Sequence, residues 1–228
     1  EKKLIYNHPP ALNHKDLINN PFTIIKAIKQ KDILLHYPYH NYNHIINLLR
    51  EASIDPKVES IKITLYRIAD SSKIANALVN AVKNGKKVMV VVELQARFDE
   101  ENNIYWADKL QEEGARVIYG VPGLKVHSKL FIITARENGK EIYYSHIGTG
   151  NFNEKSSRIY TDFSILTSNK DIAVDLNKIF DFYDNNYKIP SFKKLLVAPF
   201  FMRKNFIELI NNEIQFAGTF VIQVRGEM

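Results

Sequence analysis

The sequence has 228 residues, of which 45% are hydrophobic and 25% charged, and its formal net charge is +6. A chain of this length buries roughly 70% of its unfolded surface on folding, so a hydrophobic core alone can hold it together. Because it contains no cysteine, a disulfide framework, a cysteine-based zinc site and a thiol nucleophile are excluded. The moderate positive charge indicates an anionic partner and leaves nucleic acid, polyphosphate and nucleotide open.

The N-terminus carries no recognisable targeting signal. Its first ten residues, EKKLIYNHPP, lack an apolar signal core and a small-residue cleavage site. No apolar run approaches the ~18 residues that suggest a membrane-spanning helix. We therefore expect a cytoplasmic location and no membrane span. The first residue is not methionine, so we expect a piece excised from a longer protein.

The first half of the sequence alternates predicted strands and helices after an irregular polar segment at 1–31. Periodicity predicts helices at 22–30, 39–53, 72–84 and 99–113, and strands at 33–36, 58–66, 87–94 and 116–119. The strand KVMVVVEL is almost continuously apolar, which is typical of a strand covered on both faces. Short glycine-containing connections between these elements predict an α/β fold with a mixed, largely parallel sheet flanked by helices.

The second half has a different pattern. Two apolar segments flank Glu137-Asn138-Gly139, which predicts a β-hairpin between 129–134 and 141–146. The other elements expected here are a strand at 162–167, a helix at 171–184, a strand or extended segment at 191–197 and a helix at 199–216.

The segment GLKVHSK at 123–129 holds the densest group of reactive side chains. His127 and Lys129 are two residues apart at the start of an apolar strand, so they point to one face. Histidine can act as a nucleophile on phosphorus, and lysine can neutralise phosphoryl oxygens. A surface histidine beside a surface lysine has the same short pattern, so this motif alone leaves both interpretations open.

A second candidate is the segment IGTGNFN at 147–153, which follows another predicted strand. Gly148 lets backbone amides approach an anion, Thr149 offers a hydroxyl and Asn151 can orient an imidazole. A helix expected near Asn153 would add its positive end. A plain strand-to-helix turn fits the same residues, and the segment is not a Walker loop.

Two arginines follow predicted parallel strands. Arg67 ends the segment ITLYR, and Arg97 follows VELQA. Because ligands bind outside the carboxyl ends of the strands in an open parallel sheet, we expect both arginines to face one crevice. Their planar guanidinium groups can hold phosphates bidentately, although either could form a surface salt bridge instead. Tyr160, in the segment RIYTD, can stack on a base or fill a half-buried core position.

Together these segments resemble a known family. His127-x-Lys129 followed by Gly148-Thr149-x-Asn151 is similar to a half-site of the phospholipase D superfamily. Most of the chain resembles the long polyphosphate kinases (type 1) more closely. The matching stretches are DILLHYPYHNY, IKITLYRIAD, VVVELQARFDEENNIYWADKLQEEGARVIYG, GLKVHSKL, HIGTGNFNEKSSRIYTDFSILT and LLVAPFFMR.

The resemblance implies reversible transfer of the γ-phosphate of ATP to polyphosphate through a phosphorylated histidine, which maps to His127. It associates Arg67 and Arg97 with magnesium and phosphate, and Tyr160 with the nucleotide. Since a guanidinium cannot ligate a cation, we interpret both arginines as holding metal-bound phosphates. Lys129 would then neutralise phosphoryl oxygens and Asn151 would orient the imidazole.

The resemblance covers one domain of such an enzyme. It implies a linker or remnant of a preceding domain at 1–31, a phospholipase D-like catalytic domain at 32–198, and a helix with the start of the next domain at 199–228. We expect the missing domains to complete the site, the full enzyme to form a homo-oligomer, and the chain alone to show little kinase turnover. Nucleic acid is not an expected partner.

Two other functions remain open at this point. One is a phospholipase D-like phosphodiesterase or nuclease, although Thr134 stands where that superfamily's motif carries an aspartate. The other is a non-catalytic module that binds polyphosphate.

Overall fold

The computed structural model describes residues 9–18, 24–93 and 100–216. The strands in these residues are β1 (Ile33–Tyr37), β2 (Val58–Leu65), β3 (Lys87–Val92), β4 (Arg116–Tyr119), β5 (Lys129–Glu137), β6 (Lys140–Gly148) and β7 (Asp162–Thr167). The helices are η2 (Lys15–Leu17), α1 (Ile24–Gln30), α2 (Asn43–Ile54), α3 (Lys73–Lys83), α4 (Glu100–Glu112), η4 (Ser156–Arg158), α5 (Lys170–Asp184) and α6 (Met202–Phe216), where η denotes a 3-10 helix.

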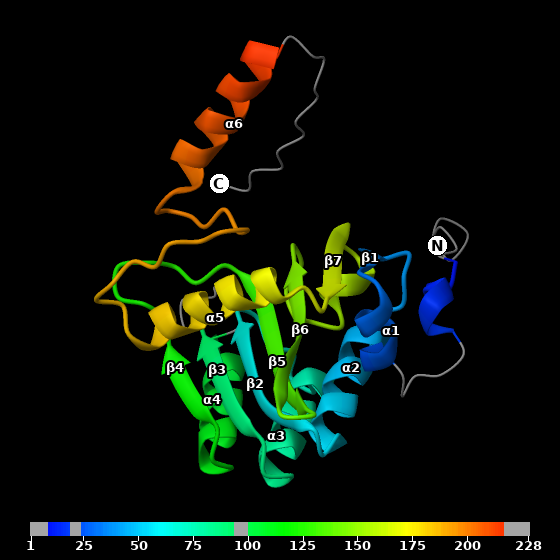
Figure 1. Ribbon diagram of the computed structural model, residues 1–228. Helices are drawn as coiled ribbons and strands as arrows, with labels where there is room; N and C mark the ends of the chain where they lie inside the picture. Colours follow the sequence, from blue (N-terminus) through cyan, green and yellow to red (C-terminus); the bar gives the residue numbers. More distant parts are fainter. Residues whose placement is uncertain (1–8, 19–23, 94–99, 217–228) are drawn as a thin grey trace, which may run out of the picture.

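The strands form one mixed sheet in the order β1-β7-β6-β5-β2-β3-β4 (Figure 1). β2, β3 and β4 pair in parallel, and all other neighbours pair antiparallel. Only β5 and β7 therefore run against the direction of the other strands. The α/β class and the mixed sheet are confirmed, but the parallel pairing is confined to one end of the sheet.

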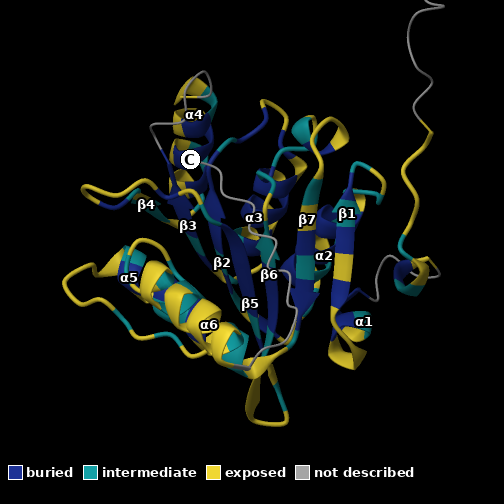
Figure 2. Ribbon diagram, turned by 90° about the horizontal axis from the view of Figure 1, so that it is seen from above, coloured by how far each residue is buried: buried dark blue, intermediate teal, exposed yellow. Residues whose placement is uncertain are grey.

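Helices cover both faces of this sheet. α2, α3 and α4 lie on one face and α5 on the other, as the view from above shows (Figure 2). Val90 and Val92 belong to the core under α2–α4, whereas Val91 belongs to the core under α5. Alternate side chains of β3 therefore enter opposite cores, which explains its almost continuous apolar sequence.

Local signals place several element ends. Ser72 caps α3, with its Oγ accepting from the Ala75 backbone N–H at 3.1 Å. Asn138 and Gly139 have φ of 51° and 75°, so the β5–β6 turn uses the left-handed region that Asn-Gly favours. The predicted hairpin is confirmed, and the helix expected at 72–84 starts at its serine cap.

The structure corrects the elements predicted after α5 and leaves the predicted domain boundaries open. Residues 191–197 form no strand, which removes the first of the two alternatives expected there, and the predicted last helix begins at Met202 instead of 199. α1 packs into the core under α2–α4 through Ile24 and Ile28. The domain boundaries at 31 and 198 stay predictions.

Among the helices in the described part of the chain, none has the length and apolar character needed to cross a bilayer.

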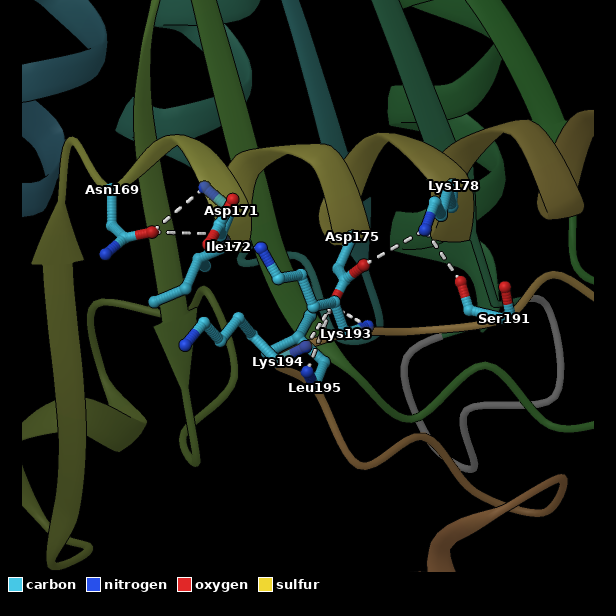
Figure 3. A network of polar contacts seen from close by, with 9 residues as sticks. All are labelled: Asn169, Asp171, Ile172, Asp175, Lys178, Ser191, Lys193, Lys194 and Leu195. Atoms are coloured by element: carbon cyan, nitrogen blue, oxygen red, sulfur yellow. Dashed lines mark hydrogen bonds and ion pairs between the residues drawn. The ribbon is translucent and has the colours of Figure 1, made fainter.

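A buried carboxylate fastens the segment after α5 to that helix (Figure 3). Asp175 is completely buried, and its Oδ2 accepts from the backbone N–H groups of Lys193, Lys194 and Leu195 at 2.8, 2.6 and 3.1 Å. Its Oδ1 lies 3.3 Å from Lys178 Nζ. Burial works to raise the pKa of Asp175, but these donors outweigh it and hold the pKa below its ordinary value.

Replacing this carboxylate should destabilise the fold. Asp175→Asn is expected to lower the free energy of unfolding by about 1–3 kcal/mol at pH 7, because charge-assisted bonds to buried donors weaken. The matched control is Asp171→Asn on the same helix, whose ion pair with Lys193 is exposed. It should change stability by less than about 1 kcal/mol. Equal effects of the two substitutions in urea unfolding would contradict this account.

Candidate active site

Strand ends from both halves of the chain meet at one edge of the sheet, which we call the site edge. β2, β3 and β6 end there, and β5 and β7 begin there (Figure 1). Lys129, the first residue of β5, is paired with Gly148, the last of β6. On the other side of β5, Thr64 Oγ1 donates to the Ser128 carbonyl at 2.7 Å and accepts from Leu130 N–H at 3.0 Å. The two glycine-containing motifs therefore lie side by side.

The predicted nucleophile and its lysine are in contact. His127 is exposed in the loop before β5, whereas Lys129 is buried at 4% exposure. Lys129 Nζ lies 3.1 Å from His127 Nδ1 and 3.2 Å from Nε2, and it also donates to the His127 carbonyl. A histidine open to solvent beside a buried ammonium can receive an anionic group with its charge already opposed.

Positive groups also gather around Tyr66, a residue that our reading of the sequence missed. Its ring lies edge-to-face with the His127 ring, with centroids 4.9 Å apart. The cationic groups of Arg67, Lys125 and Lys129 lie 5.8, 5.5 and 5.2 Å from its centroid. The alternation Lys125-x-His127-x-Lys129 was the sequence signal that could have included Lys125.

Two further residues that the sequence analysis missed hold this edge together. Asn103, fully buried on α4, donates to the carbonyls of Tyr66 and Glu93 at 2.9 Å each. Its Oδ1 accepts from Ile68 N–H at 3.1 Å. Glu93 Oε2 in turn accepts from Val126 N–H at 2.9 Å. One helix side chain thus joins the ends of β2 and β3, and Glu93 joins β3 to the loop that carries His127.

The glycines at the end of β6 and just after it have a packing reason for being there. A Cβ at Gly148 would come within 2.7 Å of His146 Cε1, and one at Gly150 within 2.6 Å of Asp162 Oδ2. Between them, Thr149 Oγ1 donates to Asp162 Oδ1 at 2.8 Å and accepts from the Phe163 backbone N–H at 3.0 Å. The loop is therefore pressed against the start of β7. Phosphate binding by Gly148 and Thr149 stays a prediction.

The remaining predicted site residues have different outcomes. Asn151 Oδ1 is buried, has no hydrogen-bond partner among the described residues, and makes no bond to His127 there. Tyr160 is 63% exposed in the loop before β7, so its ring is open to a ligand. The helix expected near Asn153 is only the short η4. Arg97 lies outside the described residues.

Metal ligation does not suit the side chains that this edge presents. Within the described ranges, no group of three or more histidine, aspartate or glutamate residues is placed to hold a metal ion. Arg67, Lys125 and Lys129 are donors without a lone pair and cannot ligate Mg²⁺.

A pocket of about 420 Å³ opens beside His127. Its walls are mostly apolar and include Leu124, Phe182 and the segment 195–200 after α5. Ser128 Oγ and Tyr183 OH, 2.9 Å apart, form a polar contact next to it. The segment fastened by Asp175 thus forms one wall of a cavity at the predicted nucleophile.

His146 is a structural residue behind this edge. It is buried between Phe131, on which its ring stacks with centroids 4.8 Å apart, and Phe152. Its Nε2 lies 2.9 Å from Ser164 Oγ. Burial lowers the pKa of His146 to about 3, so the ring is neutral at physiological pH.

Known structures first define the class of fold. A phospholipase D family member, Nuc from Salmonella typhimurium, is similar over 69% of this chain and 93% of its own, with a TM-score of 0.52 and 16% identity. At that identity the likeness shows the fold alone. The chain therefore has a phospholipase D-like fold, as the resemblance implied.

Sequence comparisons then define the family. The sequence model for polyphosphate kinase C-terminal domain 1 matches residues 23–189. The polyphosphate kinase of Escherichia coli K12 is 48% identical over 218 residues, and the crystal structure of that from Porphyromonas gingivalis has a TM-score of 0.82 at 40% identity. Each similarity covers 93% of this chain, but only 31% of the first relative and 35% of the second. The chain belongs to the polyphosphate kinase family.

The depressed pKa of His146 predicts a specific loss of stability in acid. As the pH falls below 6.5, the unfolded chain binds a proton at this residue and the folded chain does not until about pH 3. Between pH 7.5 and 5 this costs about 2 kcal/mol of unfolding free energy. In His146→Gln, urea unfolding at the two pH values should show a difference smaller by that amount. An unchanged pH dependence would contradict it.

Proposed function

We propose that the chain provides a catalytic domain of a polyphosphate kinase, in which His127 carries the phosphoryl group between ATP and polyphosphate. The observation that supports this most is the contact between the exposed His127 ring and the buried Lys129 ammonium, at an edge where further cations gather. Membership in the polyphosphate kinase family supports ATP and polyphosphate as substrates, and the positive edge suits an inorganic polyanion.

The proposed chemistry is two successive in-line displacements. A neutral His127 ring nitrogen forms a bond to the γ-phosphorus of ATP while the bond to the bridging oxygen breaks and ADP leaves. A terminal oxygen of polyphosphate then attacks the phosphohistidine, and the ring nitrogen leaves. Both steps are reversible. Because phosphoryl transfer depends on positioning and on balancing oxygen charge, Lys129 and Arg67 would hold the transferred group's oxygens.

The remaining predicted residues fit supporting roles in this proposal. The exposed ring of Tyr160 would stack on the nucleotide base, and Thr149 with Gly148 would face phosphate. Asn151 would orient the imidazole once a ligand or a rearrangement supplies its Oδ1 with a partner. Arg97 would hold a phosphate together with Arg67. Magnesium would enter bound to the nucleotide, for which no described side-chain cluster is needed.

The threonine at position 134 favours the kinase over a phosphodiesterase, because the phospholipase D motif carries an aspartate there. In β5 it pairs with Ser60 and Tyr143, several residues from Lys129 along the strand. It therefore stands in the body of the sheet, where the aspartate of the phospholipase D motif would be. The likeness to Nuc extends to the fold and does not bring its activity with it.

We further propose that the activity needs parts beyond this chain. The chain spans about a third of the relatives it matches, 31% of the first. Other domains of the same enzyme would complete the nucleotide site, in a cytoplasmic homo-oligomer.

The role of His127 is tested by labelling with γ-³²P-ATP. In a full-length polyphosphate kinase that contains this chain, His127→Ala is expected to abolish acid-labile labelling. It should also lower polymer synthesis by at least about 10³-fold, because the nucleophile is gone. The control is His14→Ala, since His14 lies before η2 and caps it. Wild-type labelling and synthesis in His127→Ala would refute the proposal.

A further inference from the structure

Tyr66 occupies a central place at the site edge. It follows the last residue of β2, and its side chain is buried, with 8% exposure. Its backbone is fixed on both sides of Arg67, because Asn103 donates to the Tyr66 carbonyl and accepts from the Ile68 N–H. The position of the ring is therefore set by the scaffold and not by a ligand.

Three cationic groups surround this ring. Lys129 Nζ, Lys125 Nζ and Arg67 Cζ lie 5.2, 5.5 and 5.8 Å from its centroid, all within the reach of a cation–π interaction. Like charges brought this close repel one another. The negative face of an aromatic ring offsets part of that repulsion while leaving each cation able to donate hydrogen bonds elsewhere.

The same ring also touches the proposed nucleophile. The rings of Tyr66 and His127 meet at an interplanar angle of 77°, the edge-to-face arrangement that aromatic pairs prefer. One side chain thus contacts His127 and every described cation of the cluster.

We propose that Tyr66 is a positioning residue that assembles Arg67, Lys125, Lys129 and His127 into one receptor for a condensed phosphate, and that Lys125 is a phosphate-binding residue of it. This rests on the function proposed above and adds a residue and a mechanism of assembly to it. Tyr66 would act through its aromatic ring, because the ring makes the contacts with His127 and with the three cationic groups.

Lys125 has the properties that this role requires. It is exposed in the loop two residues before His127. Among the described residues, no ion pair joins its ammonium to a carboxylate, and Nζ lies 5.5 Å from the centroid of the Tyr66 ring. A phosphate chain seated at His127 would meet this ammonium at the mouth of the site, whereas the buried Lys129 would meet it from beneath.

The test is an isothermal titration calorimetry experiment at low salt, in which inorganic tripolyphosphate is added to the 228-residue chain and its affinity is measured. Tyr66→Phe keeps the ring and should bind within about twofold of wild type. Tyr66→Leu loses it and should bind at least about tenfold more weakly, which corresponds to ~1.4 kcal/mol. Lys125→Gln should weaken binding about fivefold, and Lys140→Gln, an exposed lysine of the hairpin at the other edge, should not change it.

The cycle of single and double variants separates assembly from simple loss of charge. If Tyr66 positions Lys125, the double variant Tyr66→Leu/Lys125→Gln should lose less affinity than the product of the two single losses. Equal binding by Tyr66→Leu and Tyr66→Phe, or wild-type binding by Lys125→Gln, would overturn the proposal. Because Lys125 is exposed, its variant tests the proposal even where Tyr66→Leu fails to fold.

The outcome is distinguishable from failure of the kinase proposal. Tripolyphosphate binding requires no phosphoryl transfer. If the binding variants behave as predicted but His127 is not labelled by ATP, only the kinase mechanism is rejected. If His127 is labelled but the substitutions of Tyr66 and Lys125 leave the affinity for tripolyphosphate unchanged, only this inference is rejected.

Discussion

The candidate site depends on the position of β5 between β2 and β6. Pairing with β6 sets Lys129 opposite Gly148, and the Thr64 hydroxyl holds the start of β5 against β2. A slip of one residue would turn every side chain of β5 to the other face of the sheet. It would also take Lys129 out of its pairing with Gly148. The register of one strand therefore decides whether motifs far apart in sequence share a site.

Buried polar side chains make this edge rigid. Asn103 joins the carboxyl ends of β2 and β3, and Glu93 carries that constraint to the loop before His127. On the other face, Asp175 fastens the wall of the neighbouring pocket to α5. Each of these groups is buried and hydrogen-bonded, so removing one leaves donors unsatisfied in the interior. A concentrated set of cations needs such a scaffold because mutual repulsion favours dispersing them.

Sequence patterns were most informative where a single local rule applied. The Asn-Gly turn, the Ser72 cap and the two-sided β3 follow from neighbouring residues. The strand-end rule led to Arg67, whose guanidinium lies 5.8 Å from the Tyr66 ring, while the crevice expected to hold both Arg67 and Arg97 stays a prediction. The parallel character of the sheet was overestimated because β5 and β7 enter from the second half and pair across the first. Tyr66 and Asn103 were missed for a physical reason: their importance lies in side-chain contacts between elements. The helix expected near Asn153 is replaced by the three-residue η4.

The central claim is that one edge of this sheet is an anion receptor centred on His127. The most direct measurement is the change in backbone amide ¹H–¹⁵N chemical shifts of the 228-residue chain on addition of inorganic tripolyphosphate. The account predicts the largest changes at 66–67, 125–129 and 148–151, with the hairpin residues 136–141 at the opposite edge unaffected. Changes concentrated in the hairpin, or along the lysines of 188–194, with none around His127, would contradict it.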